Sequence, residues 1–423
     1  MTNFEIAMLF LLQMAFILAV IRVVGAAARL IGQPQVVGEM IAGVLIGPSL
    51  FGLFWPELQT QLFPRQASVV IYTISQVGLI IYMFLIGVEF NIDLIRDRMR
   101  SAVFVSLAGI LTPFALGGVV TVIMLRTPGL FASNVTFTEG FLFIGSAMSI
   151  TAFPMLARII YERGLAGTSL GTLALAAGSI DDAAAWCLLA VVLSSFSGNA
   201  IIAVSAIGGG ILYALFVLLV LRRGLKWLEA AAQKQQRLSG SMLGFALMLV
   251  MLGAWFTEFV GIYAIFGAFI MGLAMPRGIV SRELEKKLEP LVTNFLLPLF
   301  FIYSGLNTEL GLIISPSLLG IAFLVIIAAV FGKGVACWAA ARISGENNRD
   351  AAAIGTLMNA RGLMELILLN IGLERGIITP AMFTIMVLMA IVTTLMASPI
   401  FEWVYRRKMT STPLATPGNE VIG

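Results

Sequence analysis

Long apolar runs follow one another along almost the whole chain, separated by short breaks that contain charged residues, proline or glycine. A run of about twenty apolar residues spans a bilayer as an α-helix, whereas barrel strands appear as about ten alternating residues. The pattern therefore predicts an all-α polytopic membrane protein. We expect thirteen transmembrane helices, at residues 4–21, 36–54, 67–88, 101–125, 139–160, 170–196, 199–221, 241–257, 259–276, 290–306, 317–341, 351–373 and 380–405.

The basic residues support this division and orient the chain. Of the 26 lysines and arginines, nearly all fall in segments that follow odd-numbered spans, and only Arg65, Arg126 and Arg375 follow even-numbered ones. Because cytoplasmic loops carry an excess of Lys and Arg, this bias predicts an N-terminus outside and a C-terminus in the cytoplasm. Residues 409–423 would form a short cytoplasmic tail. No basic segment precedes the first run, so we interpret that run as a retained span.

Thirteen spans divide into six, one and six, with the seventh (199–221) as a linking helix. A single linking helix inverts the second six relative to the first, and inverted repeats are typical of secondary transporters. Polar interruptions fall at matching places, at 149–154 (SITAFP) in the fifth span and at 358–362 (MNARG) in the twelfth. Interrupted helices in corresponding positions of two repeats indicate a transport site.

Composition narrows the chemistry. The 423 residues are 60% hydrophobic and only 11% charged, with a mean hydropathy of +1.01, whereas soluble proteins are about 25% charged. The chain contains no histidine, so we expect no transition-metal site, and proton chemistry must use Asp, Glu or Lys. We also expect no cofactor. Cys187 and Cys337 both fall in apolar runs, where we expect them to be small buried side chains.

Two adjacent acidic residues, Asp181 and Asp182, stand in the middle of the sixth span. A carboxylate at bilayer depth costs about 2.5–3.5 kcal/mol, so such residues usually mark an ion or proton site. Neighbours on a helix point about 100° apart. One aspartate can therefore pair with a lysine while the other faces a cavity and binds a cation or a proton. The alternative is that they only cap a broken helix.

Four other charged residues fall within spans. Lys333 lies in mid-span between two glycines, and we expect it to pair with an aspartate rather than reach an interface. Arg361 and Glu365 are four residues apart on one helix, where they would either neutralise each other or contact the ion. For Glu39, near the cytoplasmic start of the second span, we expect a structural role or a place at the rim of a cavity.

Other function classes fit less well. A cation channel needs rings of carbonyls or charges around a pore and leaves the interrupted helices unexplained. An intramembrane aspartyl protease needs two carboxylates that face each other across a cleft, and adjacent residues on one helix diverge too far. A sensor protein without transport would leave the lysine and both interruptions unexplained. The sequence therefore favours a transporter over an enzyme.

Several segments together carry a family resemblance: 33–39 (QPQVVGE) with Gly47-Pro48, 151–158 (TAFPMLAR), 181–186 (DDAAAW), Gly332-Lys333 and 358–366 (MNARGLMEL). They resemble the monovalent cation:proton antiporter superfamily, in the branch of Kef-type and plant cation/H⁺ exchangers. The resemblance implies a homodimer in which a core moves, elevator-fashion, against a dimerisation part. Spans 1–3 and 8–10 (about 1–90 and 241–306) would form the dimerisation part, and spans 4–6 and 11–13 (about 101–196 and 317–405) the core, within a transport domain of residues 1–408.

The same resemblance implies roles for individual residues. Asp182 would bind the cation and the proton alternately, and Asp181 would form a salt bridge with Lys333, beside two crossed broken helices. From the interruption itself we expect Thr151, Ser149 and the backbone carbonyls freed there to complete the cation shell. Supporting roles would fall to Arg361, Glu365 and Asn359.

We therefore predict a proton-coupled antiporter of a monovalent cation, with Na⁺ as the first choice and K⁺ as the second, in a bacterial inner membrane. Its partners would be the cation, H⁺ and membrane lipid, and no nucleic acid. Kef-type proteins carry a long cytosolic nucleotide-binding regulatory domain. Only a short polar stretch follows Tyr405 here, so we expect no such domain in this chain.

Overall fold

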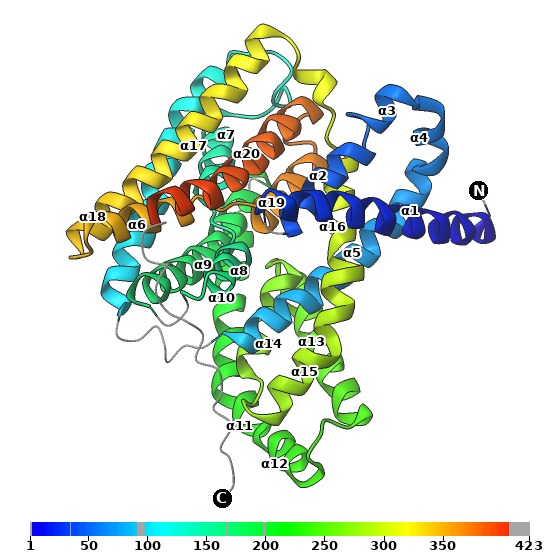
Figure 1. The fold of residues 1–423 in the computed structure, drawn as a ribbon, viewed down its shortest axis with the longest axis vertical. Helices are drawn as coiled ribbons and strands as arrows, with labels where there is room; N and C mark the ends of the chain where they lie inside the picture. The colour runs from blue at the N-terminus through cyan, green and yellow to red at the C-terminus, as the bar shows by residue number, and fades with distance from the viewer. Residues whose placement is uncertain (1, 34, 91–97, 166–167, 198–199, 406–423) are drawn as a thin grey trace, which may run out of the picture.

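The computed structural model describes residues 2–33, 35–90, 98–165, 168–197 and 200–405, and it is built almost wholly of helices (Figure 1). Within these ranges the β-structure is one isolated bridge between Phe131 and Ile378. The predicted all-α architecture is confirmed. The predicted tail at 409–423, the basic residues 406–408 and Arg96, and the first residue of the linking helix lie outside the described residues.

The first half contains nine helices among the described residues: α1 (Asn3–Leu30), α2 (Gln35–Ile46), α3 (Phe51–Phe54), α4 (Pro56–Leu62), α5 (Arg65–Glu89), α6 (Met99–Leu125), α7 (Phe137–Ser149), α8 (Phe153–Glu162) and α9 (Ser169–Ser197). The linking segment follows as α10 (Ala200–Leu215), the π-helix η3 (Phe216–Leu221), α11 (Arg222–Gly224) and α12 (Lys226–Gln235).

The second half contains α13 (Gly240–Val260), α14 (Ala264–Ala274), α15 (Ile279–Leu291), the π-helix η4 (Val292–Leu296), α16 (Leu297–Leu306), the 3₁₀-helix η5 (Leu310–Ile313), α17 (Pro316–Ile343), α18 (Asn348–Leu357), α19 (Leu363–Glu374) and α20 (Pro380–Tyr405). Local sequence starts several of these helices. At Ser315 the side chain accepts a hydrogen bond from the Leu318 amide, and Pro316 opens α17.

Ten helical segments of the described chain are long and apolar enough to cross a membrane. The remaining predicted spans are the short helix α14 and the two interrupted pairs α7–α8 and α18–α19. Each of the thirteen predicted segments thus contains a helix or an interrupted helix. Because length and composition do not establish that the three shorter segments cross the membrane, the count of thirteen stays a prediction.

Some predicted boundaries are wrong because helices continue past the apolar run that marks them. The first helix was expected to end at residue 21 but continues to Leu30. The tenth predicted span was expected to begin at residue 290, but its helix begins at Ile279. The eighth span was expected to end at 257, whereas α13 continues to Val260 and contains Glu258. The Glu258 carboxylate accepts a 2.8 Å hydrogen bond from the Ala264 amide, so it caps the start of α14.

Several main helix contacts occur twice, once between each set of helices that correspond in the two predicted repeats. The third and tenth spans correspond to each other, as do the second and ninth. Helix α5 packs on α14, and its counterpart in the second half, α16, packs on α2. Both contacts use glycines. A Cβ added at Gly87 would meet the backbone of Gly272 on α14, and one added at Gly305 would overlap the backbone of Gly43 on α2. Small residues let membrane helices approach closely in this way, and the duplicated contact reflects the inverted repeat.

A second exchanged pair joins α6 to α7 and α17 to α18. A Cβ at Gly117 would lie 2.7 Å from the Cα of Gly145, and one at Gly355 would overlap the Gly334 carbonyl. We call helices α6–α9 and α17–α20 the core bundle, and helices α1–α5 and α13–α16 the scaffold bundle. In Figure 1, α6, α7, α17 and α18 lie at the upper left, and α13–α15 lie in the lower half.

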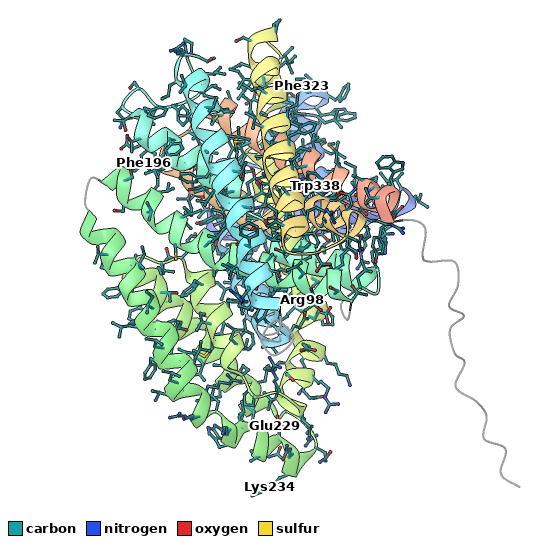
Figure 2. All side chains as sticks on the ribbon, turned by 90° about the vertical axis from the view of Figure 1, so that its left-hand side faces the viewer. Arg98, Phe196, Glu229, Lys234, Phe323 and Trp338 are labelled. Carbon is teal, nitrogen blue, oxygen red and sulfur yellow. The ribbon has the colours of Figure 1, made fainter. Side chains whose placement is uncertain are left out.

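The cytoplasmic side of the predicted topology carries the short helices α11 and α12, and Figure 2 shows α12 at one end of the molecule through its labels Glu229 and Lys234. The Glu229 carboxylate accepts 3.1 Å hydrogen bonds from the amides of Ile279 and Val280. It therefore caps the N-terminus of α15 and ties the linking segment to the scaffold bundle.

Candidate ion-binding site

Two interrupted helices meet in the middle of the core bundle. Helix α7 ends at Ser149 and α8 begins at Phe153, while α18 ends at Leu357 and α19 begins at Leu363. The Ala152 amide of the first interruption donates a 2.9 Å hydrogen bond to the Ala360 carbonyl of the second. Backbone groups that the broken helices leave open are thus partly satisfied by each other, and the predicted crossing of broken helices is confirmed.

Arg361 stabilises this crossing from the second interruption. Its side chain is fully buried, and its guanidinium donates hydrogen bonds to the carbonyls of Ala147 (3.0 Å) and Met148 (2.6 Å) in the last turn of α7. A helix C-terminus carries partial negative charge, so the cation fits there. The Arg361 amide also donates to Thr394 Oγ1 on α20 at 3.0 Å.

The expectation that Arg361 and Glu365 lie on one face of the same helix is wrong. The helix begins only at Leu363, because Gly362 at φ +154° separates Arg361 from it. No ion pair joins the two side chains, both of which are described. Glu365 is fully buried in the first turn of α19, and neither carboxylate oxygen has a hydrogen-bond partner among the described residues.

Asp181 on α9 lies beside the first interruption and receives three hydrogen bonds. Ser106 of α6 donates to Oδ1 at 2.5 Å, Thr151 donates to Oδ2 at 2.6 Å, and the Lys333 ammonium of α17 donates to Oδ2 at 2.8 Å. Lys333 also donates to the Ser149 carbonyl. All of these side chains are buried. The carboxylate therefore accepts charge-assisted and neutral hydrogen bonds from one cation and two hydroxyls.

Asp182, the next residue, has the opposite environment. Its side chain is 3% exposed, and within the described part of the chain neither carboxylate oxygen has a hydrogen-bond partner. A buried carboxylate without donors takes up a proton or pairs with a cation, because its unpaired charge would cost several kcal/mol. The two aspartates therefore differ in what they can do: Asp181 is occupied, and Asp182 is open to an ion.

The other predicted residues lie around this pair. The Ser149 hydroxyl lies 2.7 Å from the Gly145 carbonyl and 2.9 Å from the Ile110 carbonyl, so its carbonyl rather than its hydroxyl contacts Lys333. The Asn359 amide donates to the carbonyls of Val330 and Gly355 at 3.2 and 3.3 Å. Asn359 also lines a mainly apolar cavity of about 340 Å³ between α17, α18 and α20.

Glu39 and the two cysteines lie away from the aspartate pair. Glu39 on α2 is buried and accepts a 3.0 Å hydrogen bond from Gln35, one turn earlier. Cys337 is buried as expected, but the expectation for Cys187 is wrong, since its side chain is exposed on α9. An apolar run places a residue in the membrane, but it does not say whether the side chain faces protein or lipid.

Sequence reasoning missed Ser106. It lies in the apolar run at 101–125, which also contains Thr121, a buried residue whose hydroxyl bonds to the carbonyls of Gly117 and Gly140. Nothing in the local sequence separates these two hydroxyls. A group of three or more residues able to ligate a metal ion is absent from the described chain.

Comparison with known families decides the identity of this arrangement. The family described as "Sodium/hydrogen exchanger, transmembrane" matches residues 15–407. The chain belongs to this family. The family resemblance predicted from the sequence motifs is thereby confirmed, and the sodium/hydrogen exchanger family member described here is an integral membrane protein.

Curated relatives of this exchanger carry antiporter names. It is 43% identical over 398 residues to the "Na(+)/H(+) antiporter NhaS4" of Synechocystis sp., covering 92% of this chain and 97% of that one. It is 36% identical to "Cation/H(+) antiporter 17" of Arabidopsis thaliana and 31% identical to "K(+)/H(+) antiporter 1" of Saccharomyces cerevisiae. These matches cover 94% and 97% of this chain but only 48% and 49% of the plant and yeast proteins.

Solved structures show the same fold at low sequence identity. The exchanger superposes on the sodium proton antiporter MjNhaP1 of Methanocaldococcus jannaschii with a TM-score of 0.69 and 16% identity, over 98% of this chain and all of that one. Identity at this level supports the shared fold alone.

Proposed function

We propose that this protein exchanges a monovalent cation for protons across the membrane, with Na⁺ as the first choice and K⁺ as the second. The observation that carries the proposal is the difference between Asp181, which has three donors, and Asp182, which has none among the described residues. Membership of the exchanger family and the printed names of the relatives support antiport.

In the proposed cycle H⁺ and the cation compete for Asp182. Thr151 and Ser149, together with carbonyls of the first interruption, supply the remaining oxygen ligands. Thr151 donates its one proton to Asp181, so its oxygen keeps a lone pair for a cation. Binding either ion neutralises Asp182, which lowers the free-energy cost of carrying this carboxylate through the apolar interior.

The moving part in this proposal is the core bundle, which shifts elevator-fashion against the scaffold bundle. The contact pattern supports this division, because the main glycine contacts join helices within each bundle. We further propose a homodimer formed through the scaffold bundle in a bacterial inner membrane, with the N-terminus outside. Native mass spectrometry in detergent would test the dimer, and labelling of a cysteine introduced at Lys234 from each side would test the orientation.

The proposed function is tested by cation-driven proton movement in everted vesicles. Na⁺, K⁺ and Li⁺ are added in turn to vesicles with an imposed ΔpH that contain the wild type, Asp182→Asn or Asp350→Asn. Asp350 is partly exposed in the first turn of α18, away from the interruptions, and serves as the matched control. We expect Na⁺ to dissipate ΔpH in the wild type and in the control, and Asp182→Asn to lose more than nine-tenths of this activity.

Each contrary outcome has a definite meaning. Dissipation by K⁺ alone replaces the first choice of ion with the second. Normal exchange by Asp182→Asn removes the proposed site while exchange itself stands. No response of the wild type to any of the three cations, across a range of pH, overturns the proposed function.

A further inference from the structure

A second acidic side chain shares the unusual environment of Asp182. Among the described residues, Asp182 and Glu365 are the two buried acids for which both carboxylate oxygens lack a hydrogen-bond partner. The other buried acids have donors: three for Asp181, Gln35 for Glu39 and Arg98 for Glu346. A carboxylate in this position does not stay ionised without a counter-charge. The core bundle therefore holds two acids that each need a proton or a cation.

The nearest cation does not supply Glu365 with a hydrogen bond. Arg361 donates through both terminal nitrogens to the end of α7, and its Nε has no partner among the described residues. The carbonyls of Ala147 and Met148 stabilise the guanidinium on their own account. Arg361 can therefore keep its charge while Glu365 is neutral, and its free Nε–H remains available when Glu365 ionises.

The other charged side chains near Glu365 likewise donate no hydrogen bond to its carboxylate. Helices α7, α9 and α20 pack against α19. In their buried parts the charged side chains of the described residues are the two aspartates of α9, and Asp181 pairs with the buried Lys333 of α17. Lys333 and Asp181 are bonded to each other and to Ser149, Thr151 and Ser106. Release of a proton from this pair would break a closed set of contacts, whereas release from Glu365 breaks none.

We propose that Glu365 is a second proton-binding group of the transport cycle, so that two protons exchange for one cation. This inference rests on the proposed function. In the proton-loaded core, Asp182 and Glu365 each hold a proton, and Arg361 leaves the buried site with one net positive charge. In the cation-loaded core, the cation neutralises Asp182, and ionised Glu365 neutralises Arg361 through its Nε–H. Two H⁺ move one way, one cation moves the other way, and each cycle transfers one positive charge.

The test measures the coupling ratio in proteoliposomes with the membrane potential clamped at zero. At this potential a tenfold proton gradient balances an about 100-fold Na⁺ gradient when two protons exchange for one cation, and an about tenfold gradient when one does. We expect the wild type and the control Asp350→Asn to reverse at the larger gradient. Glu365→Gln, which keeps the shape of the protonated acid, should reverse at the smaller one.

A binding measurement keeps the inference testable if Glu365→Gln folds but does not turn over. NaCl is added to the detergent-solubilised protein in weak buffer, and released protons are counted against bound Na⁺. Two protons per Na⁺ from the wild type and one from Glu365→Gln support the proposal. A wild type that exchanges Na⁺ at a ratio of one overturns it while the proposed function stands. A ratio of two in both proteins overturns it as well, whereas a wild type without exchange removes the proposed function itself.

Discussion

The scaffold bundle and the core bundle are held together by different means. In the scaffold bundle α2 meets α16 and α5 meets α14 at glycines, backbone against backbone. In the core bundle glycine contacts also occur, but the centre holds Asp181, Asp182, Lys333, Arg361 and Glu365. Glu39 is the one buried charged side chain that the described scaffold bundle contains.

This difference follows from the membrane as a solvent. Lipid tails are as apolar as leucine, so close packing rather than hydrophobicity joins helices there. The glycine contacts of the scaffold bundle provide this close packing. Buried charges cost free energy in the same environment, so charged residues within membrane helices usually mark sites that bind ions or protons. The proposed ion site lies among the buried charges of the core bundle, and close packing at glycines joins the helices of the scaffold bundle.

The largest expected effect comes from placing a bulky side chain in the glycine contact between α16 and α2 of the scaffold bundle. In Gly305→Leu the side chain would occupy the space of the Gly43 backbone, so α16 and α2 must separate. We expect most of the protein to be lost from the folded, monodisperse fraction in fluorescence-detected size-exclusion chromatography. Gly320→Leu is the matched control, since a Cβ at this exposed position of α17 meets nothing within 4 Å. Equal yields of the two variants would contradict the role given to the glycine contact.

An intermediate effect is expected from the core bundle. Lys333→Met removes the cation from Asp181 and keeps the length and apolar stem of the side chain. Leaving one partner of a buried ion pair alone costs about 3–5 kcal/mol, and we expect a lower thermal midpoint in detergent. Replacing the exposed Lys226 with Met is the control and should leave the midpoint within a degree or two. A Lys333→Met midpoint equal to that of the control would mean that the ion pair does not stabilise the core.

The smallest effect is expected where the two bundles meet. The Tyr303 hydroxyl of α16 donates a 3.2 Å hydrogen bond to Glu374 at the end of α19. Both side chains are partly exposed, so Tyr303→Phe should cost about 1 kcal/mol or less, because water replaces the lost partner. Thermal unfolding of the variant measures this cost. A loss as large as that of Lys333→Met would show that the bundles are joined more firmly than the comparison supposes.

Much of this arrangement was predictable because membrane helices can be recognised from their long runs of apolar residues. The apolar runs located the helices, and the polar segments at 149–154 and 358–362 located both interruptions. The adjacent aspartates and the mid-span lysine pointed to the centre of the core bundle. Such residues stand out in a sequence because lipid tolerates them poorly.

What could not be predicted depends on packing between distant segments. The partners of Arg361 are carbonyls of α7, more than two hundred positions away in the chain, so spacing along its own segment suggested the wrong partner. Ser106 bonds to Asp181 only because α6 crosses α9 at that height. Helix α1 continues to Leu30 past its apolar run, because backbone hydrogen bonding does not stop where hydropathy falls.

The exchanged glycine contacts also bear on how the chain is made. Helix α5 of the first half finds its partner α14 in the second half, and α2 likewise waits for α16. At a translation rate of about 5–20 residues per second, Gly272 emerges roughly ten to forty seconds after Gly87. During this interval the glycine face of α5 lies uncovered in the bilayer. The contacts of α5 and α2 can therefore form only after the second half of the chain has been synthesised.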